Sequence, residues 1–96
     1  ENSQIISIDN SFSNSKIAIA SKDQSVVEAY NNQFLNSTLY DLIAFNKKSF
    51  YAKGGEIYLT NKSDKNQLKI KSDLYSKILI NGSKVKNEKI DLKSIY

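Results

Sequence analysis

The stretch KILINGSKVK, residues 77–86, decides the predicted fold of this chain. At its centre stand Asn81 and Gly82, the residue types that best tolerate the positive φ angles of a type I′ turn. The flanking segments should therefore pair as an antiparallel hairpin in which Leu79 faces Lys84. In this register Ile78, Ile80 and Val85 lie on one face of the hairpin, which is expected to be buried.

The rest of the second half extends this hairpin into an antiparallel meander. Alternation predicts strands at 67–72, 75–80 and 89–93 around the central hairpin. Upstream, Gly54-Gly55 predicts a second tight hairpin between 49–53 and 56–60, with Lys53 facing Glu56. We find no internal sequence repeat and no linker.

Strand alternation also predicts a lysine-rich face on this meander. Side chains of a strand alternate between the two faces of a sheet. We expect the core to receive Leu68, Ile70, Ile78, Ile80, Val85, Ile90 and Leu92. The opposite face then carries Lys69, Lys71, Lys77, Lys84, Lys86, Lys89 and Lys93. This face is either a platform for an anionic partner or a solvated surface whose lysines protect sheet edges from aggregation.

The first half predicts two short strands and one helical segment. The strands are expected at 4–9 and 16–20, where isoleucines alternate with smaller residues. A helix is expected at about 22–45, with Ser21 as its cap and an apolar position at every third or fourth residue. A break of this helix near 36–38 is the alternative, because Asn and Ser are poor helix formers. The predicted fold class is α+β, with the helix packed on a mainly antiparallel sheet.

Composition limits the domain count and the available chemistry. A chain of 96 residues supports one globular domain, 1–96, with a modest core. Cys and His are absent, which excludes disulfides, thiol nucleophiles and the most common general base. Met is absent as well, so we expect a processed or excised part of a longer protein. No apolar run approaches the length of a membrane span.

Charge is distributed unevenly along the chain. Residues 1–46 contain two lysines against five carboxylates, whereas residues 47–96 contain twelve lysines against five. There is no Arg, the residue favoured for bidentate recognition of bases and phosphates, and we expect no sequence-specific nucleic-acid binding. The lysine, asparagine and isoleucine content also fits an AT-rich genome, which explains part of the basic charge without any function.

These observations lead to three functional hypotheses. The first is a non-enzymatic interaction or assembly domain of a secreted, surface or membrane-anchored bacterial protein, which acts outside the cytoplasm and binds another protein. The second is an electrostatic binder of an anionic polymer or nucleic acid through the lysine-rich face. The third, an enzyme, is disfavoured because we find no catalytic, metal or cofactor motif. The expected catalytic residues, metals and cofactors are therefore none.

Overall fold

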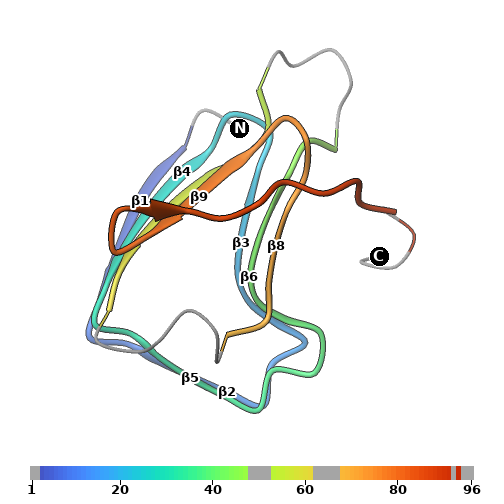
Figure 1. Cartoon of the computed structure of the whole chain (residues 1–96). Coiled ribbons are helices and arrows are strands. Elements are labelled where there is room, and N and C mark those ends of the chain that lie inside the picture. Colours follow the sequence, from blue (N-terminus) through green and yellow to red (C-terminus); the bar gives the residue numbers. More distant parts are fainter. Residues whose placement is uncertain (1–2, 48–52, 62–67, 92, 94–96) are drawn as a thin grey trace.

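The chain winds into a parallel β-solenoid, in which strands from successive turns of the chain stack side by side (Figure 1). The computed structural model describes residues 3–47, 53–61, 68–91 and 93. Strands make up 54% of it, and the described part contains no helix. The α+β prediction is therefore wrong.

Each turn of the solenoid, here called a coil, adds one strand to each of up to three sheets. The first coil contains β1 (Gln4–Ile8), β2 (Ser11–Ser13) and β3 (Ile17–Lys22). The second contains β4 (Val26–Tyr30), β5 (Gln33–Leu35) and β6 (Tyr40–Phe45). The third contains β7 (Glu56–Thr60) and β8 (Ile70–Ser72), and the fourth begins with β9 (Lys77–Ile80) and turns back as β10 (Ser83–Lys84).

The pairing between coils is parallel almost throughout. The largest sheet has the order β1-β4-β7-β9-β10, and only β10 runs antiparallel to its neighbour. The sheet β3-β6-β8 and the pair β2-β5 are parallel. The predicted antiparallel sheet is thus replaced by parallel stacks, which the long connections of a solenoid permit.

The segment 22–45, predicted as a helix, forms the end of β3 and the three strands of the second coil. Its apolar residues follow the strand period locally, since Val27 and Ala29 are buried and alternate with Glu28 and Tyr30. The three- and four-residue spacing that indicated a helix arises because the segment turns corners between strands. Parallel pairing with the first coil holds this segment as a strand, with Val27 opposite Ile5.

Asparagines occupy the corners between consecutive strands of the second coil. Asn31 and Asn36 have φ angles of 54° and 59°, a left-handed conformation that Asn tolerates better than most residues. Asp9 and Asn14 occupy the equivalent corners of the first coil with φ of 54° and 57°. A continuous helix cannot contain such residues, so these positions end one strand and start the next.

The interior of the solenoid is one continuous apolar core. Burial of an aliphatic side chain contributes roughly 1.5–3 kcal/mol, so this stack is the main source of stability. Its fully buried members come from β4, β6, β7 and β9. The buried cluster comprises Ile19, Val27, Ala29, Leu42, Ala44, Ile57, Leu59, Ile78 and Ile80.

A ladder of asparagines joins the coils at the corner that follows the largest sheet. The backbone N–H of Asn10 donates to Asn32 Oδ1 at 2.8 Å, and the N–H of Asn32 donates to Asn61 Oδ1 at 3.0 Å. The N–H of Asn61 in turn donates to Asn81 Oδ1 at 2.9 Å. The successive pairs are 22, 29 and 20 residues apart. Because the coils differ in length, no fixed sequence period exists to be found.

In the second half, the Asn81-Gly82 hairpin is confirmed in the predicted register, with Leu79 opposite Lys84. The hairpin at Gly54-Gly55 is wrong, because both edges of β7 are occupied by parallel neighbours, β4 and β9. Most of its other predicted arm, 48–52, lies outside the described residues. Residues 89–91, predicted as strand, have no strand structure. The meander is thus reduced to one hairpin.

Most of the core positions expected in the second half are confirmed. Ile78 and Ile80 are buried in the main core, and Leu68, Ile70 and Val85 pack against it. A second cluster, formed by the buried side chains of Ile43 and Phe45, receives Ile90 from the C-terminal segment. Leu92 lies outside the described residues.

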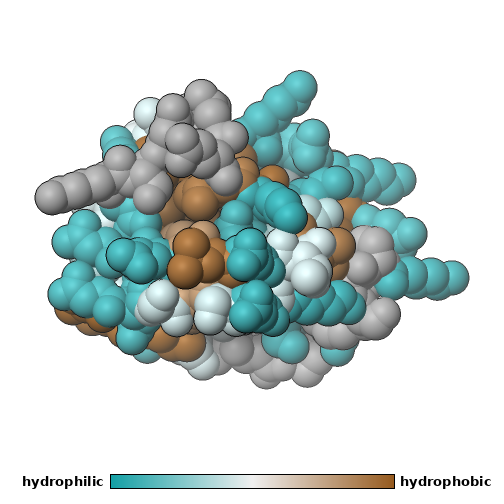
Figure 2. Space-filling view, turned by 90° about the horizontal axis from the view of Figure 1, so that it is seen from below, coloured by the Kyte–Doolittle hydropathy of each residue, from teal (hydrophilic) through white to brown (hydrophobic). Residues whose placement is uncertain are grey.

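The first coil exposes several large apolar side chains. In the first coil, Ile5, Ile6 and Ile8 are 53%, 61% and 57% exposed. Ile5 lies on the edge strand β1 opposite buried Val27, whereas Ile6 and Ile8 are on the outward face, opposite Glu28 and Tyr30. Figure 2, which views the molecule from the side of β2 and β5, shows separate hydrophobic areas among hydrophilic side chains. Leu35 on β5 is a further apolar side chain that is half exposed.

Candidate functional site

The most distinctive surface feature is a chain of three adjoining hollows, which we call the lysine groove. The first hollow is lined by Lys53, Lys77 and Lys84 and shares Leu74 and Tyr75 with the second. The second shares Lys89 and Ile90 with the third, which also includes Lys93. The lysine groove therefore runs from the start of β7 and β9 along the C-terminal segment.

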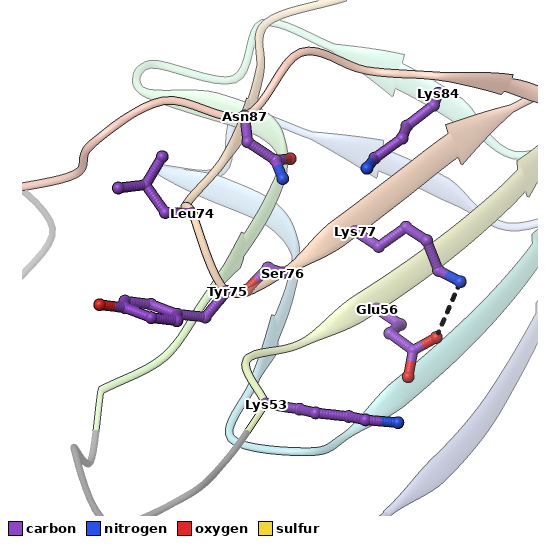
Figure 3. Close-up of a pocket in the computed structure, with 8 residues that line it drawn as sticks. All are labelled: Lys53, Glu56, Leu74, Tyr75, Ser76, Lys77, Lys84 and Asn87. Atoms are coloured by element: carbon purple, nitrogen blue, oxygen red, sulfur yellow. Dashed lines mark ion pairs between the residues drawn. The ribbon is translucent and has the colours of Figure 1, made fainter.

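The first hollow is the one with the most polar lining, and Figure 3 shows its walls. Its volume is about 300 Å³, at the lower end of the range for small-ligand pockets. Lys77 and Lys84 come from paired strands β9 and β10, and Lys53 precedes β7. Tyr75 and Leu74 form the wall shared with the second hollow, where their side chains are 65% and 59% exposed.

The floor of this hollow depends on a glycine. A Cβ atom on Gly54 would lie 1.9 Å from Ser76 Oγ, so a side chain there would displace this hydroxyl from its present position. Ser76 is buried, and its hydroxyl has no hydrogen-bond partner among the described residues. Asn87 Oδ1, in the same lining, is also buried without a partner there. Such orphaned polar atoms are uncommon in folded proteins.

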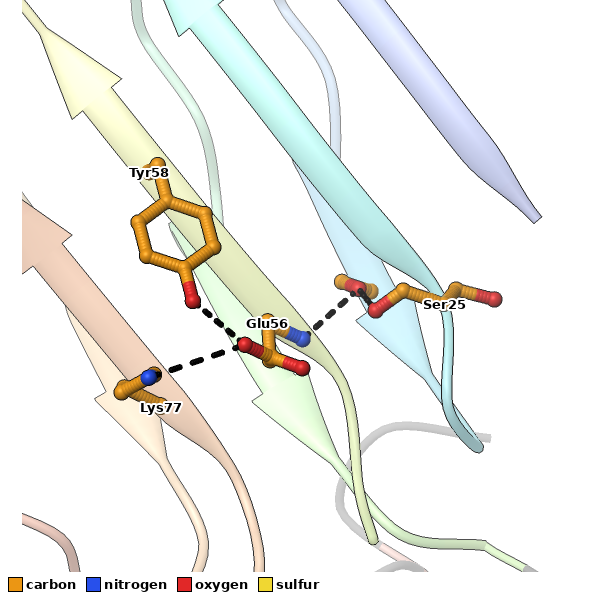
Figure 4. Close-up of polar contacts among 5 residues, drawn as sticks. Ser25, Glu56, Tyr58 and Lys77 are labelled. Carbon is orange, nitrogen blue, oxygen red and sulfur yellow. Dashed lines mark hydrogen bonds and ion pairs between the residues drawn. The ribbon is translucent and has the colours of Figure 1, made fainter. Parts of the chain in front are cut away.

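One wall of the hollow carries a three-residue polar cluster, drawn in Figure 4. Lys77 Nζ lies 3.7 Å from Glu56 Oε1 and 5.5 Å from the centre of the Tyr58 ring. The Tyr58 hydroxyl donates a hydrogen bond to the same carboxylate oxygen. The parallel register places these side chains on adjacent strands, since Glu56 pairs with Lys77.

The contacts within the cluster raise the pKa values of both Tyr58 and Lys77. The hydrogen bond to Glu56, together with burial, raises the pKa of Tyr58 above its usual 10.0, and Lys77 partly opposes the shift. The Tyr58 hydroxyl and the Glu56 charge raise the pKa of Lys77 above 10.5. Both groups therefore keep their protons at physiological pH, so Lys77 presents a positive charge.

The carboxylates that line the lysine groove are already engaged. Glu56 pairs with Lys77, and Asp73 accepts the backbone N–H groups of Asn46 and Tyr75. Asp91 accepts the N–H of Lys93 at 3.0 Å. In the described part of the chain, no carboxylate pairs with the ammonium groups of Lys53, Lys84 or Lys89. The groove thus has a net positive charge.

The predicted lysine face is divided between this groove and other surfaces. Four of its members, Lys77, Lys84, Lys89 and Lys93, line the groove. Lys69 lies elsewhere and donates to the carbonyl of Ser37 at 2.8 Å. Lys71 forms an ion pair of 3.8 Å with Glu88, and Lys86 is exposed on the C-terminal segment, outside the groove lining.

Sequence reasoning missed Lys53, because the incorrect hairpin assigned it to a strand facing Glu56. The signal that could have identified it is its position before Gly54-Gly55, which indicates a close backbone approach as well as a turn. Among the described residues, no group of three or more carboxylates is arranged to hold a metal ion.

Comparison with protein-family models finds no match, and searches among curated proteins and solved structures likewise find none. No helix in the described part of the chain is long and apolar enough to cross a membrane. The functional argument therefore depends on the geometry and charge of the lysine groove.

Proposed function

We propose that this chain is a non-enzymatic binding domain and that the lysine groove holds an acidic polysaccharide. The observation that carries the proposal is that three neighbouring hollows share lining residues and together are lined by five lysines. A polymer with a negative charge on each unit could contact several of these lysines at once. Many weak contacts of this kind add up through multivalency.

The chemistry of the lining favours sugars with acidic substituents. Ammonium groups act as point charges that attract carboxylate or sulfate without a fixed geometry. The exposed ring of Tyr75, next to Leu74, offers a flat apolar surface on which one face of a sugar ring can pack. Ser76 and Asn87 supply hydroxyl and amide groups at the floor, where a small rearrangement would let them bond to sugar hydroxyls.

Nucleic acid is a weaker candidate for the same groove. The chain contains no Arg, the residue that binds phosphate and base edges bidentately. Of the aromatic residues, the described lining contributes only Tyr75, whereas single-strand binders present several stacking rings along a basic groove.

The experiment is a titration of the chain with heparin, polygalacturonate and single-stranded DNA at two salt concentrations. We expect saturable binding of at least one polysaccharide, weakened by salt because the contacts are exposed charge pairs. Replacing Lys84 by Glu should weaken it about tenfold, or about 1.4 kcal/mol, because the change removes one attraction and adds a repulsion.

Lys16→Glu provides the matched control. It makes the same change of charge just before β3, outside the groove lining, and should leave the affinity nearly unchanged. Equal losses in both variants would show that only the total charge matters. No binding of either polysaccharide at low salt, or a clear preference for DNA, would refute the proposal.

A protein partner is the second candidate function, and the exposed apolar edge of the first coil favours it. The proposal also includes a location outside the cytoplasm, as part of a secreted, surface or anchored bacterial protein. A leader or anchor encoded ahead of Glu1 would support this location, whereas a start Met immediately before Glu1 would contradict it.

A further inference from the structure

Two buried polar atoms at the floor of the first hollow have no hydrogen-bond partner among the described residues. They are Ser76 Oγ and Asn87 Oδ1, and both residues line the hollow. The whole Ser76 residue is only 6% exposed. A buried polar group without a partner costs free energy, and a ligand that supplies the missing partner recovers it.

The two atoms differ in the partners that they can take. The Oδ1 atom of an Asn side chain accepts hydrogen bonds and cannot donate one. The oxygens of a carboxylate or a sulfate are acceptors as well, so neither group can pair with Asn87 Oδ1. A hydroxyl group can pair with it by donating, and the Ser76 hydroxyl can donate to or accept from the same kind of group. The floor therefore matches the uncharged hydroxyls of a sugar.

The positive charge of the hollow lies on a different side from Asn87. Figure 3 shows the side chains of Lys53, Lys77 and Lys84 on the side of β7 and β9. Tyr75 and Asn87 lie on the other side of the hollow. Lys77 already has an ion pair, but no carboxylate in the described part of the chain pairs with Lys53 or Lys84. A ligand that fills the hollow should therefore carry its acidic group at one end and free hydroxyls at the other.

A uronic acid has this arrangement of groups. Its carboxylate is attached to one carbon of the sugar, and hydroxyls are attached to others. In a sulfated sugar, sulfate groups replace some of these hydroxyls, which removes donors and would bring acceptor oxygens close to Asn87 Oδ1. The volume of the hollow, about 300 Å³, limits it to a small ligand or a short piece of a polymer.

We infer that the first hollow selects a uronic-acid unit with free hydroxyls over a sulfated sugar. The inference rests on the proposed function and names the chemical class of its ligand. The selectivity comes from rejection as well as attraction, because a sulfate at the floor would leave Asn87 Oδ1 unpaired and repelled.

Charge alone predicts the opposite order of affinities. A sulfated polymer carries more negative charge per unit, so a surface that offered only ammonium groups would bind it more tightly. A preference for the unsulfated polymer would therefore come from the floor of the hollow and not from the lysines.

The test compares heparin with heparin that has been desulfated and N-acetylated, because these two polymers share one backbone. In titrations at the same low salt concentration, wild type should bind the desulfated polymer about tenfold more tightly, since a sulfate leaves a buried acceptor unpaired. In Asn87→Ala this preference should be lost, so that heparin binds at least as tightly. Gln33→Ala is the control. It removes an amide from an exposed position on β5, outside the groove lining, and should keep the preference.

Ser76→Ala provides a second variant and an independent measurement. Because the Ser76 hydroxyl has no partner among the described residues, its removal should leave the midpoint of thermal unfolding unchanged or raise it. The same variant should bind the desulfated polymer several-fold more weakly. A purely structural role of Ser76 would give the reverse, which is a lower midpoint with unchanged affinity.

A wild type that binds heparin more tightly than the desulfated polymer would overturn the inference, as would an unchanged preference in Asn87→Ala. Both results would leave the proposed function standing, since an acidic polysaccharide would still bind. Absence of binding to either polymer would instead refute the proposed function, and the inference with it.

Discussion

The Oδ1 atom of Asn61 accepts a hydrogen bond of 3.0 Å from the backbone N–H of Asn32, although 29 residues separate them. Asn61 also donates from its amide to the carbonyl of Asn32. Both residues are buried, at 7% and 2% exposure. A side chain of the third coil thus satisfies the backbone of the second where the chain turns a corner and the ladder between strands is interrupted.

Replacing Asn61 by Ala should therefore destabilise the protein more than the loss of a few side-chain atoms alone would. The substitution leaves a buried N–H and a buried C=O of Asn32 unpaired, and each such group costs about 1–3 kcal/mol. We expect the midpoint of thermal unfolding to fall by roughly 10–20 °C, given about 4–8 °C per kcal/mol for a domain of this size. Asn10→Ala, at an exposed position, is the control and should cost much less.

Gly55→Ala should be among the most damaging single substitutions in the chain. A Cβ atom there would lie 1.9 Å from the carbonyl oxygen of Ser21 and 2.2 Å from its carbonyl carbon. Because backbone must move to relieve the clash, we expect a loss of about 3 kcal/mol or more in a denaturant titration.

Gly82→Ala is the control for this prediction. Gly82 has a φ of 86° and open space around the position of a Cβ atom, so only conformational strain of about 1 kcal/mol is expected. Equal losses in the two variants would contradict the close contact between Gly55 and Ser21.

Glu56→Gln should lower the pKa of Tyr58 toward its ordinary value, because the carboxylate is the largest cause of the upward shift. A raised pKa in the folded state means that the contribution to stability is complete below pH 10 and is lost as pH rises through the raised pKa. The variant should therefore lose less stability in alkali than wild type. NMR titration of the Tyr58 ring measures the pKa directly. Glu88→Gln, which removes the same charge next to Lys71, should leave it unchanged.

Tyr75→Ala should weaken polysaccharide binding without changing its dependence on salt. The ring supplies apolar contact and no charge, so its loss should reduce affinity by a similar factor at low and high ionic strength. Truncating a lysine of the groove should instead reduce the salt dependence itself. Parallel titrations of Tyr75→Ala and Lys84→Ala at two salt concentrations separate these effects, and identical behaviour would contradict the assigned role of Tyr75.

Local patterns in the sequence predicted the features that depend on local chemistry. The Asn81-Gly82 turn fixed a hairpin and its register, because few residue pairs tolerate two positive φ angles in succession. Alternation identified β1, β9 and the buried positions of Ile78 and Ile80 in advance. Four of the seven lysines proposed as a basic face line one groove.

The parallel architecture depended on contacts that no local pattern reveals. Val27 lies between Ile5 and Ile57 in the stacked sheet, and nothing near Val27 in the sequence indicates either partner. The sequence marks Asn36 only as a poor helix former, and its left-handed conformation becomes evident only in the folded chain. Coils of unequal length also concealed the repetition that usually identifies a solenoid.

The one-dimensional stacking of the coils has a consequence for how the molecule comes apart. A coil is held mainly by its immediate neighbours, so the free energy of opening increases with the number of coils that must be separated. Amide protons of β3, on the outermost turn, should therefore exchange with deuterium sooner than those of β6, which is enclosed on both sides. Within the described residues, we expect local opening to begin at strands that have a neighbour on one side only.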